Sequence, residues 1–343
     1  MNRPETALPA HLVGQDEPLT PAGNHGSSSN AGLQLAPLRF DDLEHMGHTF
    51  QSLLETEDET IRKLGQALFQ RIAVLNWSVE WNLPHWLGAG SLTEDQERRL
   101  VTANVLGLGF IRLHDDRQDG EQLSTDHAAG LRLEGLLLEA AKNEYTELLG
   151  DSAWFWEQFD RHMQSWEQMM RSSSSWILGL DFESISPTHL SDIGAPLLIS
   201  CDAICSLTGK TSRYSDFQAP VRHYLAAAVL FDHLKDWQED LAAGRANIFI
   251  ETMLAPYSGE RDASSMMPAM YLALTRTEVV RCYIQLLLDQ LEAGIGDALK
   301  MHMLGFAQHL DALKDEASSS ADLSLARIEG LLVQAQGLLV SER

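Results

Sequence analysis

The chain has 343 residues, of which 44% are hydrophobic and 22% charged, a composition typical of a globular protein with a substantial core. Its formal net charge of -24 at pH 7 and its pI near 4.8 would repel the phosphate backbone of a nucleic acid or an anionic membrane surface. No nucleic-acid partner is therefore expected, and an anionic substrate would need bridging cations.

The three cysteines, Cys201, Cys205 and Cys282, form no Cys-x-x-Cys pair and lack nearby histidines at zinc-ligand spacing. This pattern argues against a disulfide framework or a zinc site. The N-terminus shows neither the basic region nor the apolar region of a signal peptide. The chain also has no run of about 18 uninterrupted apolar residues, the length that a spanning helix needs. We expect a cytoplasmic protein without an integral membrane segment.

Residues 1–35 are rich in Pro, Gly, Ser and Asn and follow no apolar periodicity, which predicts a disordered N-terminal leader. In residues 36–343, apolar residues recur every three or four positions, and Gly or Pro falls mainly between the apolar segments. This pattern predicts one all-α domain, a bundle of about ten or more helices. The predicted helices are 41–56, 59–82, 92–119, 122–149, 152–175, 188–208, 219–243, 264–294, 298–315 and 322–340.

Two kinds of signal predict where these helices begin and end. Ser91-Leu-Thr-Glu94 matches a capping box, in which two side chains three residues apart bond each other's backbone N–H. It helps to place the start of helix 92–119. Gly120 and Gly244 are expected to end two of the helices, because glycine readily takes the left-handed conformation found there.

The first acidic cluster, Asp115, Asp116 and Asp119, lies at the C-terminal end of predicted helix 92–119 and follows an apolar stretch. Residues three or four apart share a helix face, with about 5 to 6 Å between neighbours, so these carboxylates can meet the same ions. Acidic groups at a helix C-terminus oppose the macrodipole, and like charges at this spacing repel. A bound cation reverses both costs. The alternative is a solvated acidic helix end.

The second acidic cluster, Asp232, Asp236 and Asp240, repeats every four residues on predicted helix 219–243, after the apolar segment 224–231. On one continuous helix these side chains spread over roughly 80° of one face and about 12 Å of length. Hard cations take oxygen ligands, and Mg²⁺ often shares them with substrate phosphates. Two such clusters in one apolar bundle predict a central cavity that gathers Mg²⁺ around a diphosphate.

Cations and aromatic residues near the clusters complete the expected site. Candidate diphosphate contacts, with an ordinary surface position as the alternative, are Lys235, Arg245 and Arg222. Asn247 is a candidate for orienting a ligand or the diphosphate, or else a turn residue. Aromatic residues expected to line the cavity, with core packing as the alternative, are Phe110, Tyr224, Phe231 and Trp81. No catalytic residue is assigned beyond the metal ligands.

The two clusters resemble the metal motifs of the class I isoprenoid synthase superfamily. Asp115-Asp-Arg-Gln-Asp119 is similar to its Asp-Asp-x-x-Asp motif. The segment from Asp232 to Asn247 is similar to the second metal motif of microbial terpene cyclases, with Asp at all three ligand positions. A second resemblance, to the second motif of squalene and phytoene synthases, is carried by Asp236, Glu239, Asp240, Gly244 and Arg245.

The resemblance implies an isoprenoid synthase fold in which a trinuclear Mg²⁺ cluster binds a prenyl diphosphate. The implied enzyme is a class I terpene cyclase, a carbon–oxygen lyase that ionises a C15 or C20 prenyl diphosphate, cyclises the carbocation and releases diphosphate. The elements by which elongating and head-to-head prenyltransferases are known are not seen in this sequence. The alternatives left open are a prenyltransferase of either type and a non-catalytic helical scaffold or subunit. A homodimer is one option for assembly.

Overall fold

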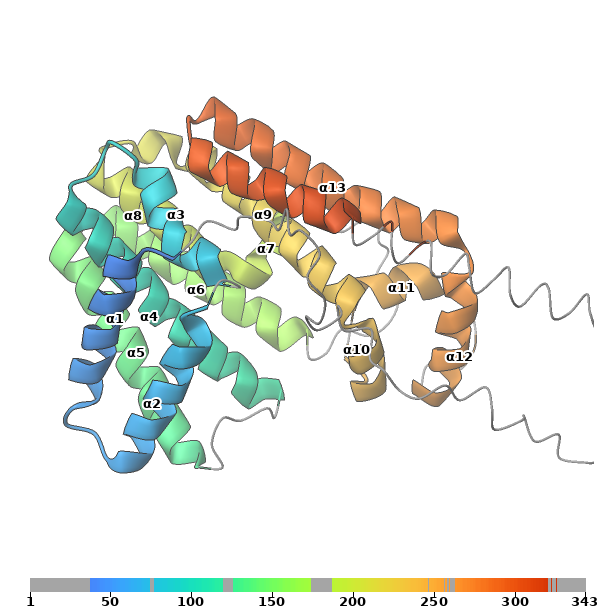
Figure 1. The fold of residues 1–343 in the computed structure, drawn as a ribbon, viewed down its shortest axis with the longest axis horizontal. Helices are drawn as coiled ribbons and strands as arrows, with labels where there is room; N and C mark the ends of the chain where they lie inside the picture. Colours follow the sequence, from blue (N-terminus) through green and yellow to red (C-terminus); the bar gives the residue numbers. More distant parts are fainter. Residues whose placement is uncertain are drawn as a thin grey trace, which may run out of the picture. The chain divides into compact units, whose positions relative to one another are not determined.

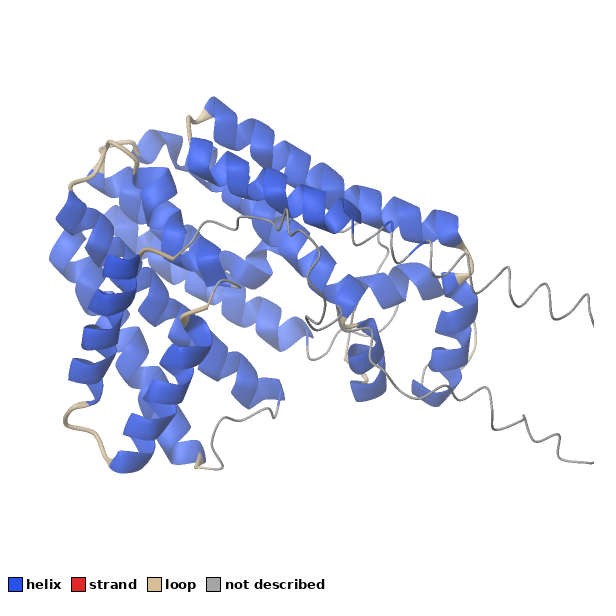
Figure 2. Cartoon of the chain, in the orientation of Figure 1, coloured by secondary structure: helices blue, strands red, loops and turns tan. Residues whose placement is uncertain are grey.

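The computed structural model describes residues 38–74, 77–119, 126–173, 187–245, 247–255, 257, 259, 263–319, 322 and 325. These residues all belong to the unit Gln34–Arg343, one of two units into which the chain divides. Throughout them the regular structure is helical and contains no strand (Figure 2), which confirms the all-α prediction. The predicted leader 1–35 lies outside the described residues, and predicted helix 322–340 lies almost wholly outside them.

The helices are labelled and coloured in chain order in Figure 1. The first part of the chain forms α1 (Phe40–Leu54), α2 (Glu59–Ile72), α3 (Ser78–Gly88), α4 (Glu94–Asp119), α5 (His127–Leu149) and α6 (Ala153–Ser173). The second part forms α7 (Pro187–Ser191), α8 (Leu198–Leu207), α9 (Tyr214–Lys235), α10 (Trp237–Ala243), α11 (Ile248–Leu254), α12 (Ala263–Leu274) and α13 (Thr277–Lys300). Short 3₁₀ turns are η4 (Asp192–Leu197) and η5 (Thr211–Arg213). Residues 304–319 are also helical.

The capping box at the start of α4 lies two residues later than predicted. Thr93 N–H donates to the side chain of Gln96 at 2.9 Å, and Gln96 N–H donates to the hydroxyl of Thr93 at 3.3 Å. Ser91 instead belongs to the preceding turn, where its N–H donates to Gly88 O at 2.8 Å. The prediction of Ser91 and Glu94 as the box was therefore wrong. Thr93 and Gln96 form the box instead, since glutamine can take the place of glutamate at its second position.

Three predicted helices are each divided in two. Helix 59–82 divides between α2 and α3, and the indole N–H of Trp81 donates to Ile72 O at 3.0 Å, a carbonyl at the end of α2. Helix 264–294 divides at Thr275 and Arg276, and helix 219–243 divides at Asp236. The apolar spacing continues across each division, because both pieces pack on the same core, so periodicity alone does not reveal the breaks.

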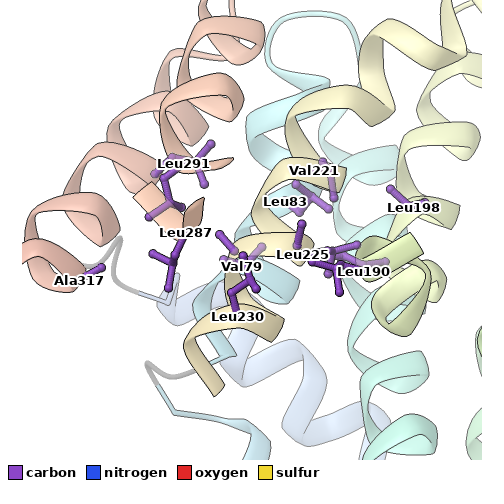
Figure 3. Packing of buried hydrophobic residues seen from close by; sticks show 14 of the residues in the cluster. Val79, Leu83, Leu190, Leu198, Val221, Leu225, Leu230, Leu287, Leu291 and Ala317 are labelled. Carbon is purple, nitrogen blue, oxygen red and sulfur yellow. The ribbon is translucent and has the colours of Figure 1, made fainter. Parts of the chain in front are cut away.

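Helices α3 and α4 each contribute side chains to two apolar clusters. Trp81 and Val105 belong to a cluster with α1, α2 and α5, whereas Leu83 and Leu100 belong to a larger cluster with the later helices. Figure 3 shows part of the larger cluster, in which Leu83 of α3 gathers with Val221 and Leu225 of α9 and with side chains of α7 and α8. The N-terminal half of α4 and the middle of α9 therefore belong to one buried apolar cluster, whereas the later part of α4 packs in the cluster with α1, α2 and α5.

The 304–319 helix runs back along α13, and α13 packs against α9 (Figure 1). Gly294 allows this close approach: a Cβ atom there would lie 3.1 Å from Leu310 Cδ1 and 3.2 Å from His223 Cβ. The hydroxyl of Tyr283 donates to Leu230 O at 3.0 Å and ties α13 to the end of α9 that carries the second acidic cluster.

One stretch of the described residues is long and apolar enough to cross a membrane by length and composition alone. It is His189–Leu207, with a mean hydropathy of 1.4, and 67% of its most apolar window is buried within the protein. Burial of this degree is typical of a core helix, so the stretch is weak evidence for a membrane span. The expected absence of a membrane segment stays a prediction.

Candidate acidic site at the ends of α4 and α9

The neighbouring carboxylates of the first cluster are held by different elements. Asp116 is 6% exposed and forms an ion pair with Arg71 of α2. Asp115 accepts a hydrogen bond from Arg112, one turn earlier on α4, whose guanidinium lies 4.9 Å from the ring centre of Trp77. The side chain of Asp119 lies outside the described part of the chain. Successive residues on a helix point about 100° apart, so Asp116 serves helix packing while Asp115 faces another direction.

The second cluster lies on a kink rather than on one straight helix. Asp236 has φ -99° and ψ 9°, and it ends α9 and precedes α10. The backbone ladder still continues through it, with Asp236 N–H donating to Asp232 O at 2.8 Å and Asp240 N–H donating to Asp236 O at 2.9 Å. The prediction of a single continuous helix was wrong here, and the kink changes the direction of Asp240 relative to Asp232.

Asp232 and Asp236 lie one helical turn apart, so their charges act on each other. Burial of the carboxyl, and then the nearby charge of Asp236, raise the pKa of Asp232 to about 6. Asp232 is nevertheless an exposed residue, so solvent screens part of this effect. Lys235 lies 4.0 Å from Asp236, the limit of an ion pair. Two ionised carboxylates one turn apart repel each other, and a divalent cation bound between them removes that repulsion.

Asp240 has a well-defined set of partners. Its two oxygens accept hydrogen bonds from Arg245 Nε at 2.8 Å and from Asn247 Nδ2 at 2.7 Å. Gly244, directly before Arg245, has φ 70° and ends α10, which confirms the cap predicted there. Gly120, the other predicted cap, lies outside the described residues. Arg245 thus lies beside a carboxylate of the cluster, and its predicted contact with a diphosphate stays a prediction.

Asn247 is completely buried and joins three segments. Its Oδ1 accepts from Phe249 N–H at 2.9 Å and from Ile250 N–H at 3.2 Å, so it is the N-cap of α11. Its Nδ2 also donates to His233 O at 2.9 Å. Asn247 therefore has a structural role at the start of a helix, as the alternative interpretation expected, and the same side chain also orients Asp240.

Arg222 is turned toward α7 and η4. Its guanidinium donates to the hydroxyl of Ser191 at 2.9 Å and to the carboxylate of Asp192 at 3.1 Å. A second contact, to Gln218 at 3.4 Å, links it to buried Asp202, which Gln218 reaches at 2.8 Å. These contacts hold Arg222 in a structural network, and its predicted contact with a diphosphate stays a prediction.

The four predicted cavity aromatics have unlike surroundings. Trp81 is 1% exposed and packs in the core, whereas Phe231 is 37% exposed. Phe110 packs with its ring centre 5.7 Å from that of Trp166. Tyr224 packs 6.1 Å from Phe306 on the 304–319 helix. Of these four aromatic residues, only Phe110 and Tyr224 are partly buried, and each lies on one of the two helices that carry the acidic clusters.

Glu80 on α3 is a site residue that the sequence did not single out. Its Oε2 is buried and has no hydrogen-bond partner among the described residues. Burial raises the pKa of Glu80 to about 7, an effect that the charge of Arg112 opposes. Burial, and then the charge of Glu80, raise the pKa of Tyr224.

His233, next to Asp232, was also missed. Its Nδ1 accepts a hydrogen bond from Ile248 N–H at 3.2 Å, so it joins α9 to the start of α11. Burial lowers the pKa of His233 to about 4, although Asp240 and Asp236 act in the opposite direction. Its position within the Asp232 to Asp240 motif was the only signal that could have drawn attention to it.

Within the described residues, no group of three or more His, Cys, Asp or Glu side chains is arranged to hold a metal ion. The donor set at Asp232 and Asp236 nevertheless fits Mg²⁺ by its chemistry, because it offers paired carboxylate oxygens in a partly open position. Comparison of the sequence with protein-family models and with curated proteins finds no match.

Proposed function

We propose that this protein is a class I terpene cyclase that ionises a C15 or C20 prenyl diphosphate with Mg²⁺, cyclises the carbocation and releases diphosphate. The observation that carries the proposal is the placement of Asp232 and Asp236 one helical turn apart at the kink between α9 and α10, where Asp236 N–H donates to Asp232 O at 2.8 Å. Such a pair is unfavourable when both groups are ionised, and a divalent cation removes the repulsion.

The contacts of the aspartates suggest different roles for them. Asp115, Asp119, Asp232 and Asp236 would hold the metal. Asp116 would position the end of α4 through Arg71. Asp240 has one bond to each oxygen and keeps a second lone pair on each, so it can ligate while Arg245 and Asn247 fix its direction.

Bound Mg²⁺ would supply Lewis-acid stabilisation of the charge that develops on the diphosphate leaving group. The chain's own contribution is to place the carboxylates, to bring Arg245 and Lys235 close to them, and to surround the hydrocarbon with apolar and aromatic side chains. Arg245 would lie beside the departing diphosphate because its bond to Asp240 holds it there. The partly buried Tyr224 would face the hydrocarbon and help to exclude water.

The deciding experiment offers C10, C15, C20 and C25 prenyl diphosphates singly to the full chain with Mg²⁺, and measures diphosphate release and hydrocarbon products. Release from a single substrate with cyclic products supports a cyclase. A requirement for a second isoprenoid substrate supports a prenyltransferase, and no release from any substrate supports a scaffold or subunit. Asp236→Asn should lose turnover, whereas the matched change Asp289→Asn at an exposed position of α13 should keep it.

A further inference from the structure

His309 differs from the other buried histidines in its surroundings. It lies on the 304–319 helix and is 5% exposed, and both ring nitrogens are buried without a hydrogen-bond partner among the described residues. By contrast, His162 bonds to Asp202 at 2.8 Å, and His85 bonds to Asp42 at 2.8 Å. An unbonded polar group in the interior costs free energy, so a histidine at this position stabilises the fold less than an apolar side chain of similar size would.

Aromatic side chains surround His309. Its ring centre lies 5.1 Å from that of Trp86 and 6.4 Å from that of Tyr224. Phe306 packs 5.5 Å from Trp86 and 6.1 Å from Tyr224. We call Trp86, Tyr224, Phe306 and His309 the aromatic group. Ring faces attract a cation, and a histidine among them adds a basic nitrogen that the rings lack.

One member of the aromatic group, Tyr224, lies on the same helix as Asp232 of the second acidic cluster. Tyr224 precedes Asp232 by eight residues on α9, which is roughly 12 Å along a helix. A hydrocarbon chain anchored by its diphosphate at the second acidic cluster and extending along α9 toward its N-terminus would therefore reach Tyr224 of the aromatic group.

We propose, on the basis of the proposed function, that His309 is the base that ends the reaction by taking a proton from the last carbocation. In this step a C–H bond next to the cationic carbon breaks, and its electron pair forms the C=C bond of the product. The proton forms an N–H bond with a ring nitrogen of His309, and the resulting imidazolium returns it to water when the product leaves.

The neutral form of His309 is the one that this step needs. Burial lowers its pKa to about 4, so the ring carries no proton on one nitrogen at neutral pH. A neutral ring also avoids placing a positive charge beside the incoming carbocation. A carbocation is a far stronger acid than imidazolium, so transfer remains downhill despite the lowered pKa.

The test compares wild-type protein with His309→Ala on the substrate that the wild type converts, measuring diphosphate release and product composition separately. Ionisation occurs at the acidic clusters, so diphosphate release should persist. The wild-type product should form roughly 100-fold more slowly, the lower end of what a general base contributes, and alcohols or other alkenes should replace it.

Chemical rescue separates a basic role from a space-filling one. Added imidazole should restore the wild-type product in His309→Ala, whereas pyrrole, which has the same shape and no basic nitrogen, should not. His223→Gln, on the same helix as Tyr224 but bonded to Gln290, is the matched control and should keep the wild-type product. If thermal melting shows that His309→Ala does not fold, His309→Gln is assayed in its place.

The outcomes distinguish this inference from the proposed function. An unchanged product in the His309 variants, or rescue by pyrrole as good as rescue by imidazole, overturns the role of His309 and leaves the cyclase proposal standing. A wild-type protein that releases no diphosphate from any prenyl diphosphate overturns both.

Discussion

The side-chain amide of Asn247 donates a hydrogen bond to Oδ2 of Asp240 at 2.7 Å. The same side chain caps α11, through bonds from Phe249 N–H and Ile250 N–H. One buried residue therefore determines both where the next helix begins and how a carboxylate of the acidic site is oriented. Stability and site geometry are coupled at this position.

Asn247→Ala should destabilise the protein by about 2 to 3 kcal/mol. The lost N-cap accounts for about 1 kcal/mol, and the buried partners left without a bond account for about 1 to 2 kcal/mol more. Denaturant unfolding of the two proteins measures the difference. Asp58→Ala is the control, because Asp58 caps α2 at an exposed position and should cost only about 1 kcal/mol. Equal costs for the two variants would contradict the joint role of Asn247.

Asp236→Asn should stabilise the metal-free protein slightly and remove its response to Mg²⁺. Loss of the repulsion with Asp232 is worth about 0.5 kcal/mol, or an increase in Tm of about 1 °C for a chain of this size. Millimolar Mg²⁺ should raise the Tm of the wild type, because a ligand that binds only the folded state stabilises it. Calorimetry with and without Mg²⁺ measures both effects, and an undiminished Mg²⁺ response in the variant would count against these ligands.

Asp116→Ala and Asp115→Ala should have opposite profiles. Asp116 is 6% exposed and paired with Arg71, so its removal should cost about 2 kcal/mol of stability by leaving a partly buried guanidinium unpaired. Asp115→Ala should cost less stability but abolish diphosphate release. Parallel unfolding and turnover measurements test this division of roles. Full activity in Asp115→Ala would remove Asp115 from the ligand set.

Because His309 is buried in its neutral form, it should make the protein less stable in acid. The pKa of His309 falls from 6.5 to about 4 on folding. Between these two pH values the unfolded state binds a proton at His309 and the folded state does not. This effect is absent above pH 6.5, and it lowers the unfolding free energy by at most roughly 3 kcal/mol as the pH falls toward 4.

The measurement is the difference in unfolding free energy between wild type and His309→Phe at several pH values. Taking the difference cancels the opposite effect of Glu80, whose raised pKa of about 7 favours the folded state as the pH falls. The unfolding free energy of the wild type should fall relative to that of His309→Phe between pH 6.5 and 4, and two parallel pH curves would show that His309 is not held neutral.

Local patterns in the sequence determined the helical class, most helix positions, the left-handed cap at Gly244 and the two groups of aspartates. These features depend on residues within a few positions of one another, which is the range over which helical periodicity and capping act. The same patterns did not show the break between α2 and α3 or the kink at Asp236. The spacing of the apolar residues that pack on the core is the same whether or not the helix is broken, so the pattern does not reveal the break.

Tertiary structure alone decided which partner each charged side chain found. Asp115 and Asp116 are adjacent in sequence, yet Asp116 binds Arg71 of α2 because α2 packs beside that face of α4. Glu80 and His309 are unremarkable in the sequence, since a lone acid or histidine carries no local pattern. They become notable only where the packing of α3, α9 and the 304–319 helix buries them without bonded partners, because burial and partner choice depend on segments far apart in the chain.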